Sequence, residues 1–289
     1  MSGASGVTER FELPHPSGEG VAVLSISHPR RSAAGDVDVP VIFLLDADAS
    51  FAVASELAHA RAFGGLVRDP IVVGIGYDAD FLTMLKRRTL DLTPPPSEGD
   101  SAIVEGLKAL IGTRHGGADI FLRFVLNAVV PEVLARVPNA SRDDHILLGH
   151  SLGGLFVAYA LLKHPEAFSV FGLASPSLWW NNFAILENLV GFEERIHKLK
   201  RKPGVLVSVG AMEQDLPTKP IPGVAMTLEQ AQAWIKSARM IDAAREFCAA
   251  LTVAGLPRVE FVSFEGEDHE SVGPVSLNRA ISFSLLRSS

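Results

Sequence analysis

Short apolar runs alternate along this chain with longer segments in which apolar residues recur every three or four positions. The short runs have the length of strands, and several are apolar almost throughout, as is typical of strands buried on both faces. We predict strands around Phe11 and at Val21–Ser27, Val39–Leu45, Ile71–Gly76, His145–Leu148, Val170–Leu173, Gly204–Val209 and Val259–Phe264. The longer segments predict helices at Ala49–Phe63, Ala118–Val137, Leu152–His164, Thr227–Ala254 and Val275–Leu286.

This alternation favours an α/β fold with a mostly parallel central sheet and helices on both faces. The first two strands are joined only by residues 14–20, so we expect them to be antiparallel. We expect one domain over residues 1–289, with insertions near 78–117 and 179–202 that form walls of a pocket, because long connections in a compact domain are usually functional.

Composition removes several functional classes. A formal net charge of -7 argues against a nucleic-acid partner, which would require a basic face. The single cysteine, Cys248, lies in a helical pattern and is expected to be a small buried residue. The N-terminal residues lack the pattern of a signal peptide, and no apolar run is long enough to span a membrane. We therefore expect a cytoplasmic protein that does not bind membranes.

The strongest chemical signal is Gly149-His150-Ser151-Leu152-Gly153, which lies between a predicted strand and a predicted helix. In that context G-x-S-x-G forms a sharp turn that exposes the serine hydroxyl as a nucleophile. The following helix directs free N–H groups at the site, so the backbone N–H of Leu152 is a candidate oxyanion donor. The alternative, a glycine-rich turn without chemistry, does not account for a suitable histidine downstream.

A serine hydroxyl needs a base to remove its proton, and in such folds the order is serine, acid, histidine. His269 follows the last predicted strand and is our candidate base. The acid is expected after the strand at Gly204–Val209, where Glu213 and Asp215 both lie. We favour Glu213, while Asp215, or a dyad without an acid, remains open.

The chain also resembles the putative-esterase family of α/β-hydrolases, and within it the siderophore esterases of the enterobactin and bacillibactin type. The resemblance rests on an ordered set of segments from about residue 10 to the C-terminus: 40–48, 87–94, 116–122, 149–154, 174–180 and 268–271. It implies a serine carboxylic-ester hydrolase with Ser151 as nucleophile, His269 as base and Glu213 as acid.

The resemblance also implies further site residues. The second oxyanion donor would be the backbone N–H of Ala47, where relatives have glycine. The substrate-binding arginine would be Arg88 or Arg87. Independently of the resemblance, Trp179 and Trp180 follow the strand after the elbow helix, so we expect one of them to bind substrate and the other to lie in the core, and His150 within the elbow is a further candidate for substrate binding. An arginine suits catecholate oxygens because its donors form a rigid fork, although an ion pair of Arg88 with Asp91 would explain it equally well.

The expected reaction is the transfer of an acyl group from a small-molecule ester to water. The favoured substrate is a siderophore trilactone or a related ester. It needs no cofactor, and no group of histidines or cysteines has metal-ligand spacing. A general carboxylesterase on short acyl esters is the alternative among enzymes. A non-catalytic binding module on the same fold is the alternative outside them, and the retained serine and histidine argue against it.

Overall fold

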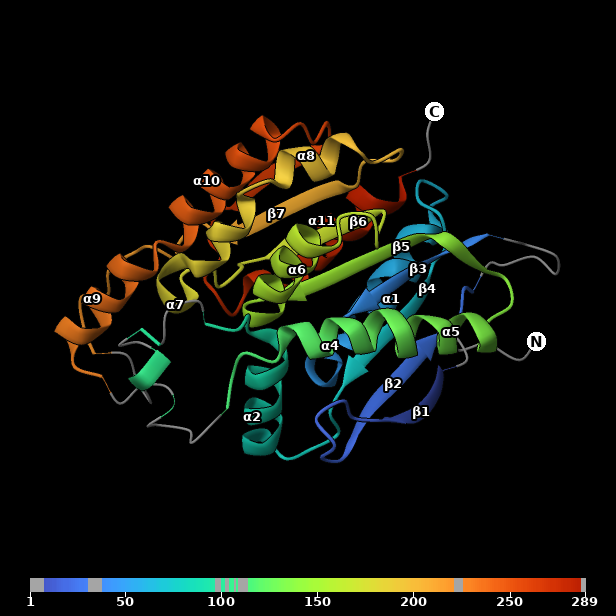
Figure 1. The fold of residues 1–289 in the computed structure, drawn as a ribbon, viewed down its shortest axis with the longest axis horizontal. Helices are drawn as coiled ribbons and strands as arrows, with labels where there is room; N and C mark the ends of the chain where they lie inside the picture. The colour runs from blue at the N-terminus through green and yellow to red at the C-terminus, as the bar shows by residue number, and fades with distance from the viewer. Residues whose placement is uncertain are drawn as a thin grey trace.

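Eight strands form one sheet in the computed structural model, which describes residues 8–30, 38–96, 100–101, 104–106, 108, 114–220 and 226–286. Their order is β1-β2-β4-β3-β5-β6-β7-β8 (Figure 1). The strands are β1 (Thr8–Pro14), β2 (Val21–Ser27), β3 (Val39–Leu44), β4 (Ile71–Gly76), β5 (Ala140–His150), β6 (Val170–Ala174), β7 (Gly204–Gly210) and β8 (Val259–Phe264). All eight predicted strands are confirmed.

The direction of the strands is also as expected. β1 pairs with β2 and β2 with β4 in antiparallel fashion, while every pair from β4 to β8 is parallel. The sheet is therefore mostly parallel with an antiparallel N-terminal edge, which is the arrangement predicted from the sequence. Because β3, β5, β6, β7 and β8 run the same way, the loops that follow them meet at one edge of the sheet.

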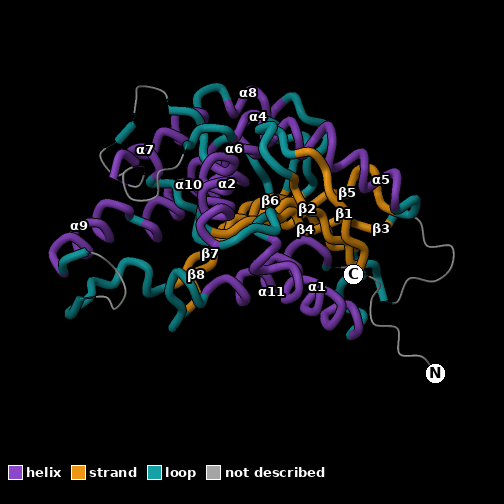
Figure 2. The backbone as a smooth tube through the Cα atoms, turned by 90° about the horizontal axis from the view of Figure 1, so that it is seen from below, coloured by secondary structure: helices purple, strands orange, loops and turns teal. Residues whose placement is uncertain are grey.

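Helices cover both faces of this sheet (Figure 2). On one face α1 (Ala47–Phe63) and α11 (Val272–Leu285) pack on a core that includes Ile42, Leu148 and Leu206. The larger core lies on the other face, and its helices are α4 (Ala118–Phe124), α5 (Val130–Arg136), α6 (Leu152–Lys163), α8 (Phe192–His197) and α10 (Met240–Val253). The helix α2 (Phe81–Leu92) packs against α4 and α6.

Two of the predicted helices are interrupted. Between α4 and α5 the chain forms a π-helical turn at Val125–Val129. It ends two residues before Pro131, which has no N–H to donate to the helix. The segment predicted as Thr227–Ala254 is two helices, α9 (Leu228–Ala238) and α10, because Arg239 between them adopts a left-handed conformation with φ 46°. No glycine or proline marks that break.

The two predicted insertions contain short helices in addition to loops. The first holds α2, and the second holds α7 (Trp180–Phe183), a 3-10 helix at Ala184–Leu189, and α8. Among the described residues no helix is long and apolar enough to cross a membrane.

Candidate active site

Ser151 lies in the one-residue turn between β5 and α6, at the edge where the parallel strands end. Its backbone has φ 59° and ψ -118°, a strained conformation for a residue with a side chain. The turn is tight: a Cβ atom on Gly149 would lie 2.4 Å from the backbone oxygen of Gly153. A glycine at 149 is therefore required for the chain to turn so sharply and raise the Ser151 hydroxyl above the sheet.

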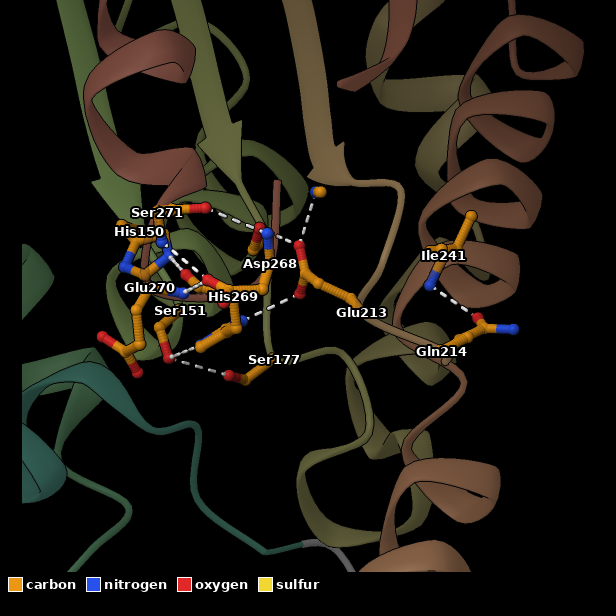
Figure 3. Close-up of polar contacts among 12 residues, drawn as sticks. His150, Ser151, Ser177, Glu213, Gln214, Ile241, Asp268, His269, Glu270 and Ser271 are labelled. Carbon is orange, nitrogen blue, oxygen red and sulfur yellow. Dashed lines mark hydrogen bonds and ion pairs between the residues drawn. The ribbon is translucent and has the colours of Figure 1, made fainter. Parts of the chain in front are cut away.

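The side chains of Ser151, His269 and Glu213 form one continuous set of hydrogen bonds (Figure 3). Ser151 Oγ is 3.0 Å from Nε2 of His269, and Nδ1 of His269 is 2.8 Å from Oε2 of Glu213. A carboxylate can only accept, so Nδ1 carries the proton and Nε2 is free to accept one from the serine. This arrangement is able to activate the hydroxyl by general-base catalysis.

Glu213 is a buried carboxylate held by three donors. Besides His269, the Ser175 hydroxyl donates to its Oε1 at 2.5 Å and the backbone N–H of Gly210 donates at 2.6 Å. Burial by itself raises the pKa of Glu213, but these hydrogen bonds outweigh it and hold the pKa below its ordinary value. Asp215, the other candidate acid, is exposed to solvent.

His150 lies directly beside His269. The two ring centroids are 4.8 Å apart, and Nε2 of His150 donates a hydrogen bond to the backbone oxygen of His269 at 2.9 Å. Burial, together with the neighbouring His269, lowers the pKa of His150, so its imidazole is neutral around pH 7. His150 therefore both lines the site and holds the loop that carries His269.

Leu152 and Ala47 are the first residues of α6 and α1, so their N–H groups have no acceptor within their helices. Asp46, the residue directly before α1, adopts a left-handed conformation with φ 53°. A Cβ atom on Gly153 would lie only 3.1 Å from Asp46 Oδ2, so the Asp46 carboxylate packs against the first turn of α6.

Arg88, on α2, forms a bidentate ion pair with Asp46. Its Nε donates to Oδ1 at 2.9 Å and its Nη2 donates to Oδ2 at 2.8 Å. The alternative pairing with Asp91 is wrong, because Asp91 is buried and accepts instead from Nε2 of His15 at 2.8 Å. Arg88 thus fixes α2 to the loop before α1.

A cavity of about 570 Å³ opens beside Ser151 and His269 and extends between the sheet and the helices α1 and α11. The predicted site residues that line it are Ser151, His269, His150 and Arg88. The first predicted insertion contributes Phe81, Met84 and Leu85 of α2 to the lining. No described residue of the second insertion, 179–202, lines the cavity.

Three of the predicted substrate-binding residues lie elsewhere. The guanidinium of Arg87 lies against Gly20, in the turn between β1 and β2. Trp180 is buried in the larger core, and Trp179 packs edge-on against Trp234 of α9, with ring centroids 4.6 Å apart. None of these three side chains is among the described residues that line the cavity.

Sequence reasoning missed Ser175 and Asp46 as parts of this site. Ser175 stands directly after β6, in a segment that carried the family resemblance. Asp46 follows β3 in the same way, at the edge where the parallel strands end. Polar residues at that position after a buried parallel strand are a general pointer to the site.

No group of three histidine, cysteine or acidic side chains among the described residues could hold a metal ion. Cys248 is buried as expected, and burial raises the pKa of its thiol to about 12, so the thiol stays protonated.

Comparison with known proteins identifies the family. Residues 96–247 match the family profile described as Putative esterase. The chain is 34% identical to a siderophore triacetylfusarinine C esterase of Aspergillus fumigatus, over 95% of this chain and 91% of the relative. It is 33% identical to the ferri-bacillibactin esterase BesA of Bacillus subtilis, over 85% and 78%. Among solved structures, the siderophore hydrolase EstA from Aspergillus nidulans superimposes with a TM-score of 0.82 at 29% identity, covering 97% of this chain and 95% of that one.

Proposed function

This chain belongs to the Putative esterase family and has the α/β-hydrolase fold, and from that premise we propose that it is a serine hydrolase that cleaves a siderophore ester. The observation that carries the chemistry is the unbroken contact from Ser151 through His269 to Glu213. The substrate class comes from the relatives, whose names state activity on siderophores.

In this proposal Ser151 Oγ attacks the ester carbonyl carbon while its proton passes to Nε2 of His269. The carbonyl oxygen becomes an oxyanion that the N–H groups of Leu152 and Ala47 stabilise, since both stand at helix starts without intrahelical acceptors. His269 then donates the proton to the leaving alcohol. Water, activated by the same imidazole, releases the acid and restores the serine. Glu213 holds the tautomer and stabilises the imidazolium.

The nucleophile is tested by Ser151→Ala, which we expect to lower kcat for p-nitrophenyl butyrate by several orders of magnitude with the fold retained. Ser177→Ala is the matched control, because the Ser177 hydroxyl forms a hydrogen bond of 3.4 Å with Ser151 Oγ, whereas it is Ser151 that contacts the base. A serine-directed organophosphate should label Ser151 alone. An active Ser151→Ala variant, or a label on another residue, would refute the mechanism.

A general carboxylesterase is the second candidate, because aliphatic side chains are the largest group in the described cavity lining. A hydrolysis panel separates the two: p-nitrophenyl esters of rising chain length beside siderophore triesters, each with and without bound iron. Turnover of the siderophores supports the first proposal, and turnover of the small esters alone supports the second. The cytoplasmic location expected from the N-terminal residues stays a prediction.

A further inference from the structure

The charged groups that line the cavity are three carboxylates and one guanidinium among the described residues: Asp46, Asp48, Glu270 and Arg88. The guanidinium is the only cationic side chain of a lysine or arginine among the described lining residues, and both oxygens of Asp46 already bind it. Glu270 also acts on Arg88, and together these carboxylates keep the pKa of Arg88 raised in spite of its burial. The positive charge of Arg88 is therefore already balanced by Asp46 and does not attract an anionic substrate.

The two remaining carboxylates, those of Asp48 and Glu270, give the cavity a net negative charge. Asp48 accepts hydrogen bonds from the backbone N–H groups of Tyr77 at 2.8 Å and Asp78 at 3.0 Å, and no lysine or arginine of the described chain forms an ion pair with it. Glu270 directly follows His269, and its side chain is exposed at the cavity. A substrate that reaches Ser151 thus meets a negative potential.

Apart from four serines, two histidines and one phenylalanine, the uncharged side chains of the described lining are aliphatic. Val53, Met84 and Leu85 contribute from α1 and α2. Leu148, Leu206 and Leu277 contribute from the sheet and from α11. The tryptophans predicted to stack on an aromatic group lie elsewhere, and Phe81, which is 74% exposed, is the one phenyl ring among the described lining residues.

We infer that this cavity selects a siderophore ester whose iron complex is uncharged and aliphatic, and discriminates against anionic aromatic complexes. The inference rests on the proposed function and narrows it. Three catecholates bring six negative charges to iron(III) and leave a trianion, whereas three hydroxamates bring three and leave a neutral complex. Like charges repel, and because Asp48 and Glu270 are exposed this repulsion is moderate and screened by salt, but only the neutral complex avoids it altogether.

Two matched substrate pairs test this. The first pair is a ferric cyclic triester that binds iron through three hydroxamates and a ferric trilactone that binds it through three catecholates. The second pair is p-nitrophenyl valerate and p-nitrophenyl hemiglutarate, which differ by a terminal carboxylate. In both pairs kcat/KM should be higher for the uncharged member by about tenfold or more. The difference should shrink as salt is raised, because salt screens the repulsion.

A charge reversal separates electrostatics from shape. Glu270→Lys should raise kcat/KM for the anionic member of each pair relative to the uncharged member. Glu193→Lys is the matched control: it makes the same change in net charge on α8, at an exposed residue that does not line the cavity, and should leave both ratios unchanged.

The outcomes are distinct for the two proposals. Hydrolysis of p-nitrophenyl valerate without turnover of either siderophore would overturn the proposed function, while the valerate and hemiglutarate pair would still decide the selectivity. Equal or better use of the anionic members, independent of salt and of Glu270→Lys, would overturn the inference itself.

Discussion

At the scale of single residues, burial and not position after the strand decides which carboxylate is the partner of His269. Glu213 and Asp215 both follow β7 within a few residues, yet only Glu213 turns inward to contact His269. Its carboxylate is desolvated and fully hydrogen-bonded, which is how a charged group remains ionised in an interior. Asp215 is solvated, and its charge is screened there.

Replacing Glu213 should therefore impair catalysis far more than replacing Asp215. In Glu213→Gln the amide cannot hold the imidazole in the required tautomer, and we expect kcat to fall by roughly two to four orders of magnitude. Asp215→Asn should retain a rate near that of the wild type. Hydrolysis of p-nitrophenyl butyrate measures both. Similar rates for the two variants would instead indicate a serine-histidine dyad.

At the scale of elements, the ion pair between Arg88 and Asp46 joins α2 to the loop that begins α1. That loop carries the Ala47 N–H, so the geometry of the proposed oxyanion hole depends on a helix distant in sequence. Asp46 also packs against α6, so a single carboxylate links three helices around Ser151.

We predict that Arg88→Ala lowers kcat/KM for a small ester as well as for a siderophore. Among the described residues, Arg88 is the one charged partner of the Asp46 carboxylate, so its loss would cost about 1–3 kcal/mol and the loop would shift. Arg87→Ala, on the same helix but against Gly20, is the control and should behave like the wild type. A loss confined to the siderophore would mean that Arg88 contacts the substrate directly.

At the scale of the whole molecule, Glu213 links global stability to pH. Its pKa in the folded state lies below its ordinary value of 4.5, so near that pH the folded state binds fewer protons than the unfolded state. The stabilisation from ionised Glu213 is fully present above the ordinary value and is lost as the pH falls through the folded pKa. Acid should therefore weaken the fold partly through this one residue.

Glu213→Gln should flatten the acid side of the stability profile. We expect the free energy of unfolding to fall less steeply between about pH 6 and about pH 3 in this variant than in the wild type, as measured by urea unfolding at several pH values. Asp215→Asn should keep the wild-type slope, since Asp215 is exposed. Parallel profiles for all three proteins would show that Glu213 contributes nothing to the acid dependence.

The sequence alone determined the features that depend on neighbouring residues. Apolar periodicity predicted all eight strands, and the short link between β1 and β2 predicted their antiparallel pairing. The elbow at Ser151 was also readable, because its glycines are needed within a few residues of the serine to avoid local collisions. The order serine, acid, histidine along the chain, together with the position of His269 after the last strand, then indicated the base.

Only the tertiary structure decided which distant groups meet. Arg88 pairs with Asp46 and not with Asp91, although Asp91 is three residues away on the same helix, because Asp91 is turned inward to His15. Trp179 likewise packs against Trp234 of α9 and not into the cavity, because a residue distant in sequence offers it an aromatic partner. The periodicity of apolar residues indicates which face of a helix or strand is buried. Which side chain it contacts there depends on packing and desolvation in the folded protein, and these involve residues far apart in the chain.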